Sequence, residues 1–167
     1  MSESLEARIR KLEDIEAIKQ LKARYGQACD DDHNPDKVAA LFVPDGLWAG
    51  ENIGVHAKGH AAIKEYIGGV RASGRMRNSA HMFMNPIITV DGDRATGEWR
   101  FVMCFTGKVG DGTFQYHRII GFYEDVYVRV GGRWLYESLN VTVEESGPYT
   151  TEDSRLFSRP ASDRVNA

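Results

Sequence analysis

The sequence predicts an α+β fold in which N-terminal helices pack on a strongly curved antiparallel sheet. Two observations support this prediction. Over the first 70 residues, apolar side chains recur every three or four positions, which is typical of amphipathic helices. From residue 80 onwards they alternate at every second position between tight turns, which is typical of strands. Helices followed by a run of strands indicate an α+β domain.

The first expected helix carries an apolar stripe along one face. The stripe consists of Leu5, Ile9, Leu12, Ile15, Ile18, Leu21 and Tyr25. The helix must stop by Asn34-Pro35, because the residue before a proline avoids the helical conformation. Asn34 suits the N-cap and Pro35 the first position of a short second helix over residues 36–42. We expect Pro44-Asp45-Gly46 to end that helix.

Two short strands and a third helix come next. The strands are expected at residues 47–49 and 55–57, joined by the turn-rich segment 50–54. The helix is expected over about residues 60–70, where apolar side chains again share one side.

Four long strands in meander order complete the fold. They are expected at residues 80–90, 95–106, 114–130 and 134–143. Asp91-Gly92-Asp93 is a strong hairpin-turn signal, and Gly131-Gly132 is another turn. Because 114–130 is long for one strand, we expect a bulge or bend near Gly121. A bent sheet crossed by a helix closes into a cone, and a cone contains an apolar pocket that suits a small ligand.

Length and charge narrow the class of protein. The 167 residues fit one domain, expected at residues 1–145, with an irregular tail over residues 146–167. The net charge is −3 without a basic run, so we expect no nucleic-acid partner. The chain has no apolar stretch long enough to span a membrane, and its polar start does not resemble a signal peptide. Cys29 and Cys104 have no metal-ligand spacing, so we expect free thiols, no metal site and a cytoplasmic location.

Three polar groups in largely apolar surroundings are the candidates for chemistry: Tyr25, the acidic run Asp30-Asp31-Asp32, and His81. A carboxylate beside an imidazole makes a general base that works near neutral pH, and a phenol can stabilise developing negative charge. Acids at a helix C-terminus oppose the helix dipole, which indicates a use for at least one of the three. The residues alone do not choose among them, and Tyr25 and His81 could equally be ordinary core residues.

Several segments resemble a known family. The similar segments are Asp14 to Tyr25, Asp36 to Trp48 with its Phe-x-Pro-Asp-Gly motif, and Gly131-Gly132-Arg133-Trp134. In these segments the chain is similar to SnoaL-like proteins of the NTF2-like superfamily, whose fold is a cystatin-like α+β cone. The resemblance spans about residues 8–145 and is greatest to the branch that holds scytalone dehydratase, bile acid 7α-dehydratase and hexachlorocyclohexane dehydrochlorinase. It implies an enzyme without cofactor or metal, and a homodimer or homotrimer.

The resemblance also implies roles for single residues. Asp30 matches the helix-end aspartate of the family, and His81 matches the strand histidine that abstracts a proton. Tyr25 matches a tyrosine five residues before that aspartate, and His117 falls near a second histidine of the branch. Some members carry an arginine on the last strand, where this chain reads Asn140-Val141-Thr142-Val143, so the resemblance does not identify a substrate anchor.

The other polar and aromatic side chains fall into two groups, those expected to contact the substrate and those expected to face solvent. Candidates for substrate contact are His117, Asn140, Trp48, Phe83 and Phe101. The remaining histidines, His33, His56 and His60, are expected in solvated loops.

The leading hypothesis is a cofactor-independent lyase of the dehydratase type, or a double-bond isomerase. Its substrate would be a small hydrophobic cyclic compound, and His81 with Asp30 would be the general base. The alternative is a non-catalytic ligand-binding or assembly domain, because this fold hosts both classes. An Asp30–His81 pair bonded inside a closed pocket would favour catalysis.

Overall fold

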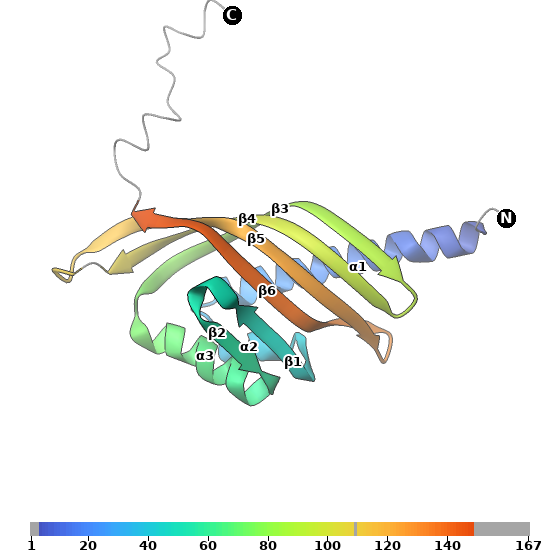
Figure 1. Cartoon of the computed structure of the whole chain (residues 1–167), viewed down its shortest axis with the longest axis horizontal. Helices are drawn as coiled ribbons and strands as arrows, with labels where there is room; N and C mark the ends of the chain where they lie inside the picture. The colour runs from blue at the N-terminus through green and yellow to red at the C-terminus, as the bar shows by residue number, and fades with distance from the viewer. Residues whose placement is uncertain (1–3, 109, 149–167) are drawn as a thin grey trace, which may run out of the picture.

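The computed structural model describes residues 4–108 and 110–148 (Figure 1). The helices are α1 (Leu5–Asp30), α2 (Pro35–Ala39), the 3₁₀ helix η1 (Glu51–Ile53) and α3 (Gly59–Ser73). The strands are β1 (Phe42–Gly50), β2 (Val55–Lys58), β3 (Met76–Asp91), β4 (Arg94–Lys108), β5 (Phe114–Val130) and β6 (Arg133–Pro148). The last strand therefore runs beyond residue 145, and residues 149–167 of the expected tail lie outside the described residues.

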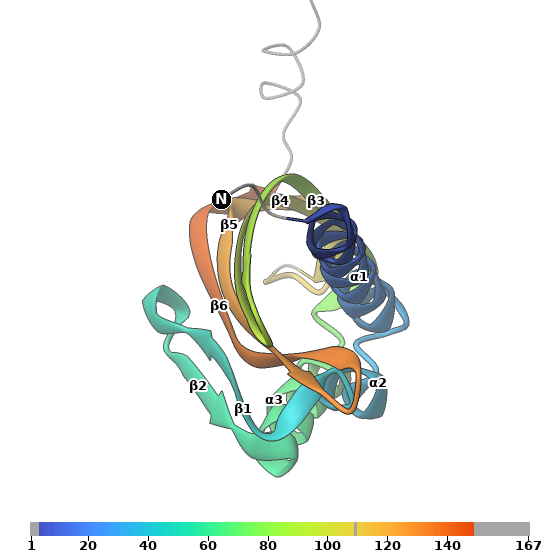
Figure 2. The ribbon, with the colours of Figure 1, turned by 90° about the vertical axis from the view of Figure 1, so that its right-hand side faces the viewer.

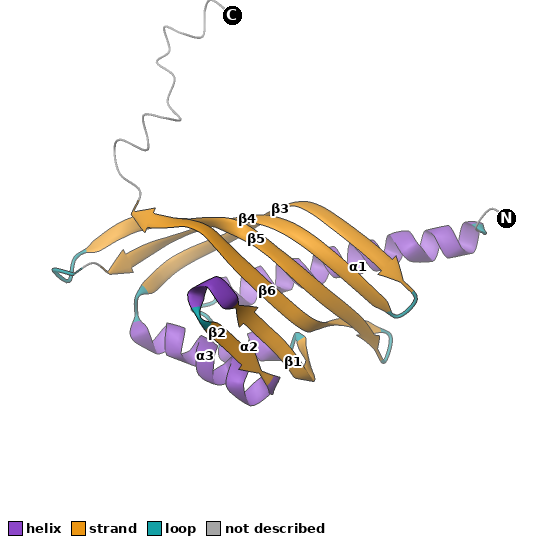
Figure 3. Cartoon of the chain, viewed as in Figure 1, coloured by secondary structure: helices purple, strands orange, loops and turns teal. Residues whose placement is uncertain are grey.

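One sheet organises the described residues. Its six strands lie in the order β2-β1-β6-β5-β4-β3, with β3 to β6 forming the expected antiparallel meander. The sheet curves strongly, and the helices lie on its concave side (Figures 2 and 3). The α+β cone is confirmed, but β1 pairs with β6 in parallel, so the sheet is mixed. Two helices (η1 and α3) and four strands (β2 to β5) separate β1 from β6 along the chain, so no hairpin forces them to run in opposite directions.

Four register shifts within the meander β3 to β6 accompany the curvature. Relative to β4, strand β3 carries one extra residue around Asn78 and another around Asn85. Both asparagines have φ of 52°, a conformation that asparagine tolerates better than most residues. Relative to β5, strand β6 carries an extra residue opposite Gly121 and another opposite Val126–Tyr127. The bulge expected near Gly121 is confirmed, and bulges of this kind bend a strand and increase its twist.

The start of β1 differs from the expected pattern. Asn34 caps α2 as predicted, because its side chain accepts a hydrogen bond of 3.1 Å from the backbone N–H of Lys37. However, α2 ends at Ala39, and residues 44–46 lie inside β1 instead of ending a helix. Phe42 explains the change, since it is almost fully buried and stacks on Tyr136 of β6 with ring centroids 5.0 Å apart.

Two ion pairs fasten α1 across the concave face of the sheet. Asp14 accepts two hydrogen bonds of 2.7 Å from the guanidinium of Arg129 in β5. Two turns later, Nζ of Lys22 lies 2.8 Å from Oδ2 of Asp125, and both side chains are almost fully buried. Within the described part of the chain, no helix has the length and apolar character needed to cross a membrane.

Candidate active site

A cavity of about 100 Å³ lies between α1, α3 and the concave face of the sheet. Most of its wall is aromatic or aliphatic. The polar atoms on the wall come from Tyr25, Cys29, His33, Trp48, Tyr66, His81 and Tyr123. Among the described residues, no Asp, Glu, Lys or Arg lines this cavity, so it suits an uncharged and largely apolar ligand.

His81 and Asp30 meet at one side of the cavity. Nδ1 of His81 lies 2.7 Å from Oδ1 of Asp30, and the backbone N–H of His81 donates to Oδ2 over 3.1 Å. Burial acts to raise the pKa of Asp30, but the two hydrogen bonds from His81 outweigh it and lower the pKa below its usual value. Because an ionised carboxylate can only accept, Nδ1 carries a proton, and in the neutral form of the ring Nε2 is the nitrogen with the lone pair. The His81 side chain is only 6% exposed and lines the cavity.

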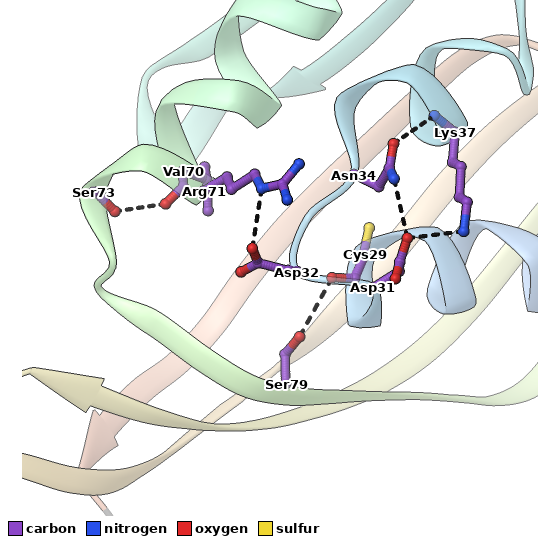
Figure 4. A network of polar contacts seen from close by, with 9 residues as sticks. All are labelled: Cys29, Asp31, Asp32, Asn34, Lys37, Val70, Arg71, Ser73 and Ser79. Atoms are coloured by element: carbon purple, nitrogen blue, oxygen red, sulfur yellow. Dashed lines mark hydrogen bonds and ion pairs between the residues drawn. The ribbon is translucent and has the colours of Figure 1, made fainter.

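The three adjacent acids point to three different partners. Oδ2 of Asp31 lies 2.8 Å from Nζ of Lys37, and Oδ2 of Asp32 lies 3.0 Å from Nε of Arg71 (Figure 4). Only Asp30 of the three contacts His81 among the described residues. The geometry thus brings together the pair that the resemblance implied.

Tyr25 lines the cavity from α1, and its hydroxyl accepts a hydrogen bond of 2.9 Å from Nε1 of Trp48. Burial raises the pKa of Tyr25 well above its usual value, so the phenol remains protonated at neutral pH. Burial also raises the pKa of the neighbouring Cys29 thiol to about 12, although a hydrogen bond from Tyr25 opposes this. At neutral pH both groups are therefore uncharged, which makes Tyr25 a hydrogen-bond donor and Cys29 a weak nucleophile.

The predicted substrate contacts divide into two groups. Trp48 and Phe101 line the cavity. Phe83 lies behind its wall, with its ring centroid 6.2 Å from those of Tyr25 and His81. Two of the three aromatic residues therefore line the cavity, and the third packs against two side chains of its wall.

His117 and Asn140 do not reach the cavity. The ring of His117 stacks on Phe105 with centroids 5.2 Å apart, and its buried Nε2 has no hydrogen-bond partner among the described residues. Asn140 alternates in β6 with Leu139 and Val141, whose buried side chains face the concave side. Asn140 therefore points to the convex face of the sheet.

His33 was expected in a solvated loop, but it is buried and lines the cavity. It is 6% exposed, and its ring centroid lies 6.2 Å from that of His81. Burial lowers the pKa of His33, and the nearby His81 acts in the same direction. No sequence signal identifies this residue, because its placement depends on a turn with positive φ at both Asp32 and His33.

The Lys22–Asp125 pair was also missed from the sequence. Nζ of Lys22 lies 3.6 Å from the centroid of the Tyr123 ring, which lines the cavity. Burial lowers the pKa of Lys22 to about 8, although Asp125 acts to raise it. Helical spacing could have revealed this residue, because Lys22 lies four positions after Ile18 and three before Tyr25 on the apolar stripe.

No metal site emerges from these groups. Within the residues that the structure describes, no cluster of three or more His, Cys, Asp or Glu side chains is arranged to hold a metal ion.

Comparison with known proteins identifies related sequences and structures. Residues 10–140 match the family model described as a SnoaL-like domain. An NTF2-like protein with a cystatin-like fold from Novosphingobium aromaticivorans is 29% identical, with a TM-score of 0.66 over 93% of this chain and 96% of that chain.

Two further solved structures share the fold at lower identity. A protein from Novosphingobium aromaticivorans proposed to be a scytalone dehydratase is 23% identical, with a TM-score of 0.72 over 84% of this chain and 91% of its own. A hexachlorocyclohexane dehydrochlorinase from Novosphingobium barchaimii is 22% identical, with a TM-score of 0.73 over 86% of this chain and 95% of its own. At these identities the likeness shows the fold alone.

Proposed function

The chain belongs to the SnoaL-like family, and we propose that it is a cofactor-independent lyase that eliminates water or halide from a small, uncharged cyclic substrate. The observation that carries this proposal is the Asp30–His81 pair at the wall of an apolar cavity. Two structural relatives are named for such eliminations, a dehydratase and a dehydrochlorinase. Their names suggest the reaction, while the geometry of this chain supports it.

The proposed chemistry begins at Nε2 of His81. Asp30 accepts a hydrogen bond from Nδ1–H of the same ring. This bond orients the ring and stabilises positive charge on it. Nε2 then removes a proton from carbon, the C–H electron pair forms the double bond, and hydroxide or halide leaves with its own bonding pair. Tyr25 donates a hydrogen bond to the leaving group or to an enolate-like oxygen, which lowers the energy of the charged transition state.

The same groups would also catalyse a double-bond isomerisation. Both reactions share proton abstraction and differ in whether the proton returns to the substrate. The cavity supports either reaction on an apolar ring, because no charged side chain among the described residues lines it. The non-catalytic alternative has less support, since a ligand-binding wall does not need a histidine oriented by a carboxylate.

Proton abstraction can be tested by incubating the protein in D2O with a panel of uncharged cyclic ketones and β-hydroxy ketones. NMR follows deuterium incorporation beside the carbonyl and formation of the alkene. We expect His81→Ala to slow the reaction at least about 10²-fold, which is the lower range for loss of a positioned base. The melting temperature of the variant should stay close to that of the wild type, because the change removes no large part of the core.

His117→Ala is the matched control, since it removes a partly buried imidazole from a strand without touching the cavity. A folded His81→Ala protein with full activity would contradict the assignment. Absence of both exchange and elimination across the panel, combined with tight binding of the same compounds, would support the non-catalytic alternative.

A further inference from the structure

His33 borders two hollows of different character. On one side it lines the apolar cavity that contains His81. On the other it lines a polar surface hollow together with Asp30, Asp32, Arg71 and Ser79. The imidazole of His33 therefore lies between the reacting region and a solvent-facing set of charged groups.

The turn after α1 holds His33 in this wall. Asp32 and His33 have φ of 52° and 51°, a conformation that costs non-glycine residues free energy and persists only where the surroundings support it. The support comes from a hydrogen bond of 2.8 Å from the His33 N–H to the Cys29 carbonyl, and from the ion pair between Asp32 and Arg71. Strain of this kind is common where a side chain must face a functional site.

The ring of His33 is available for proton transfer. Within residues 4–108 and 110–148, no hydrogen bond to either ring nitrogen is found. Its centroid lies 6.2 Å from that of His81, a separation that one bridging water can span. The titratable groups acting on it include His81, Asp30 and Asp32, and the net effect with burial is a lowered pKa, so His33 is uncharged at neutral pH and would quickly release any proton that it takes up.

We propose that His33 is the proton shuttle of this site, carrying to solvent the proton that His81 removes from the substrate. This inference rests on the proposed function and deepens it. After elimination, His81 is an imidazolium and the substrate has lost hydroxide or halide. The imidazolium gives its proton through one water to the neutral His33, which releases it to the polar hollow. Both histidines end neutral, the halide leaves as an ion and the proton passes separately to solvent; where hydroxide is the leaving group, the proton and the hydroxide together make one water.

The shuttle distinguishes elimination from isomerisation. An isomerase returns the proton to its substrate, so His81 recovers its neutral form without help. An elimination enzyme must discard one proton in each turnover when the leaving group is a halide. A second imidazole between His81 and solvent therefore favours a substrate that loses a leaving group.

The test variant is His33→Asn, because asparagine tolerates positive φ but does not exchange protons near neutral pH. With an elimination substrate from the panel, we expect kcat to fall at least about tenfold with kcat/KM nearly unchanged, because shuttling follows the elimination step and so does not enter kcat/KM. Added imidazole buffer should restore kcat, a response that a purely structural defect would not show. His117→Asn controls for loss of a partly buried imidazole outside the cavity.

A second measurement needs no substrate. In protein labelled with ¹⁵N-histidine and acidified until His81 is an imidazolium, NMR gives the rate at which its Nε2–H, the position of the shuttled proton, exchanges with water. We expect slower exchange in His33→Asn and unchanged exchange in His117→Asn. Unchanged exchange, or unchanged kcat without a response to imidazole, would overturn the shuttle. If His81→Asn also kept full activity, the proposed function itself would fall.

Discussion

The carboxylates of Asp30, Asp31 and Asp32 differ in function because each leaves the end of α1 in a different direction. All three lie at the negative end of the helix dipole, where a carboxylate needs a donor or a cation nearby. His81, Lys37 and Arg71 supply these partners in turn. Only the first partner is an imidazole, the kind of side chain that can serve as a general base, so a shift of one residue separates the proposed catalytic pair from a structural ion pair.

The pair of Lys22 and Asp125 leads to a prediction about stability. Lys22→Met leaves the Asp125 carboxylate buried without its cation, and this should lower the free energy of unfolding by about 3–5 kcal/mol. Lys22→Met with Asp125→Asn should cost less than the single change, because no uncompensated charge remains. Urea unfolding followed by circular dichroism measures both. Equal losses in the single and double variants would show that the ion pair is not the cause.

At the residue scale, pattern and resemblance predicted the Asp30–His81 pair and aromatic residues of the cavity wall, but missed other residues of the candidate site. Tyr25 follows from the helical stripe, while Asp30 and His81 follow from family motifs. His33 could not be predicted, since its position depends on two consecutive positive φ values that the sequence does not specify. His117 was expected near the substrate, but strand geometry places it against Phe105 instead.

Among the elements, β5 and β6 show how the curved sheet is built. β5 passes through Gly121 at the point where β6 carries an extra residue. A Cβ at Gly121 would lie 2.0 Å from the Thr142 carbonyl oxygen and 2.8 Å from the Phe101 ring. The absence of a side chain thus lets the backbones approach where the sheet bends, directly beside a residue that lines the cavity.

Gly121→Ala should therefore destabilise the protein, since neither the carbonyl of β6 nor the packed Phe101 ring can move freely. We expect a loss of about 1–3 kcal/mol, the usual range for overpacking, measured by thermal or urea unfolding. Gly147→Ala is the matched control, because it also lies in a strand and its Cβ would meet nothing within 4 Å. A Gly121→Ala protein as stable as this control would refute the close approach.

Local pattern predicted most elements, and long-range pairing explains the exceptions. The period-two segments and the Asp91-Gly92-Asp93 turn identified β3 to β6 because hairpins are local structures. Pro44-Asp45-Gly46 looks like a helix end in isolation, but it lies within β1 because the strand pairs with β6 on either side of it, at Phe42 and from Leu47 onwards. The parallel direction of β1 against β6 has no local signal at all.

For the whole molecule, the convex face of the sheet is notable because it carries apolar side chains that no helix among the described residues covers (Figure 2). An outer-face patch runs across three strands and consists of Met82, Met84, Val102, Ile120 and Phe122. Met82 and Met84 are 44% and 40% exposed in the single chain. Apolar side chains gathered on one sheet face commonly mark an interaction site. We propose that a second copy of the chain covers this patch in a homodimer or homotrimer.

Light scattering coupled to size-exclusion chromatography tests this proposal. The wild type should elute as a dimer or trimer at micromolar concentration, and Met82→Lys with Met84→Lys should shift it towards the monomer. The charges oppose burial of the face but leave the concave side untouched. A monomeric wild type would contradict the proposal.

The two extra residues in β3 have a consequence for how this chain tolerates change. Residues 80–84, which include His81, lie between the bulges around Asn78 and Asn85. Because side chains alternate sides along a strand, the number of residues in β3 determines which face of the sheet each one occupies. Deleting one residue at a single bulge would move the side chains on one side of the deletion to the opposite face of the sheet. A deletion balanced by a nearby insertion would keep every side chain beyond the two changes on its present face. The face that His81 occupies is thus set by the number of residues in β3, and a chain without one of these bulges would align with this strand only after a single-residue offset there.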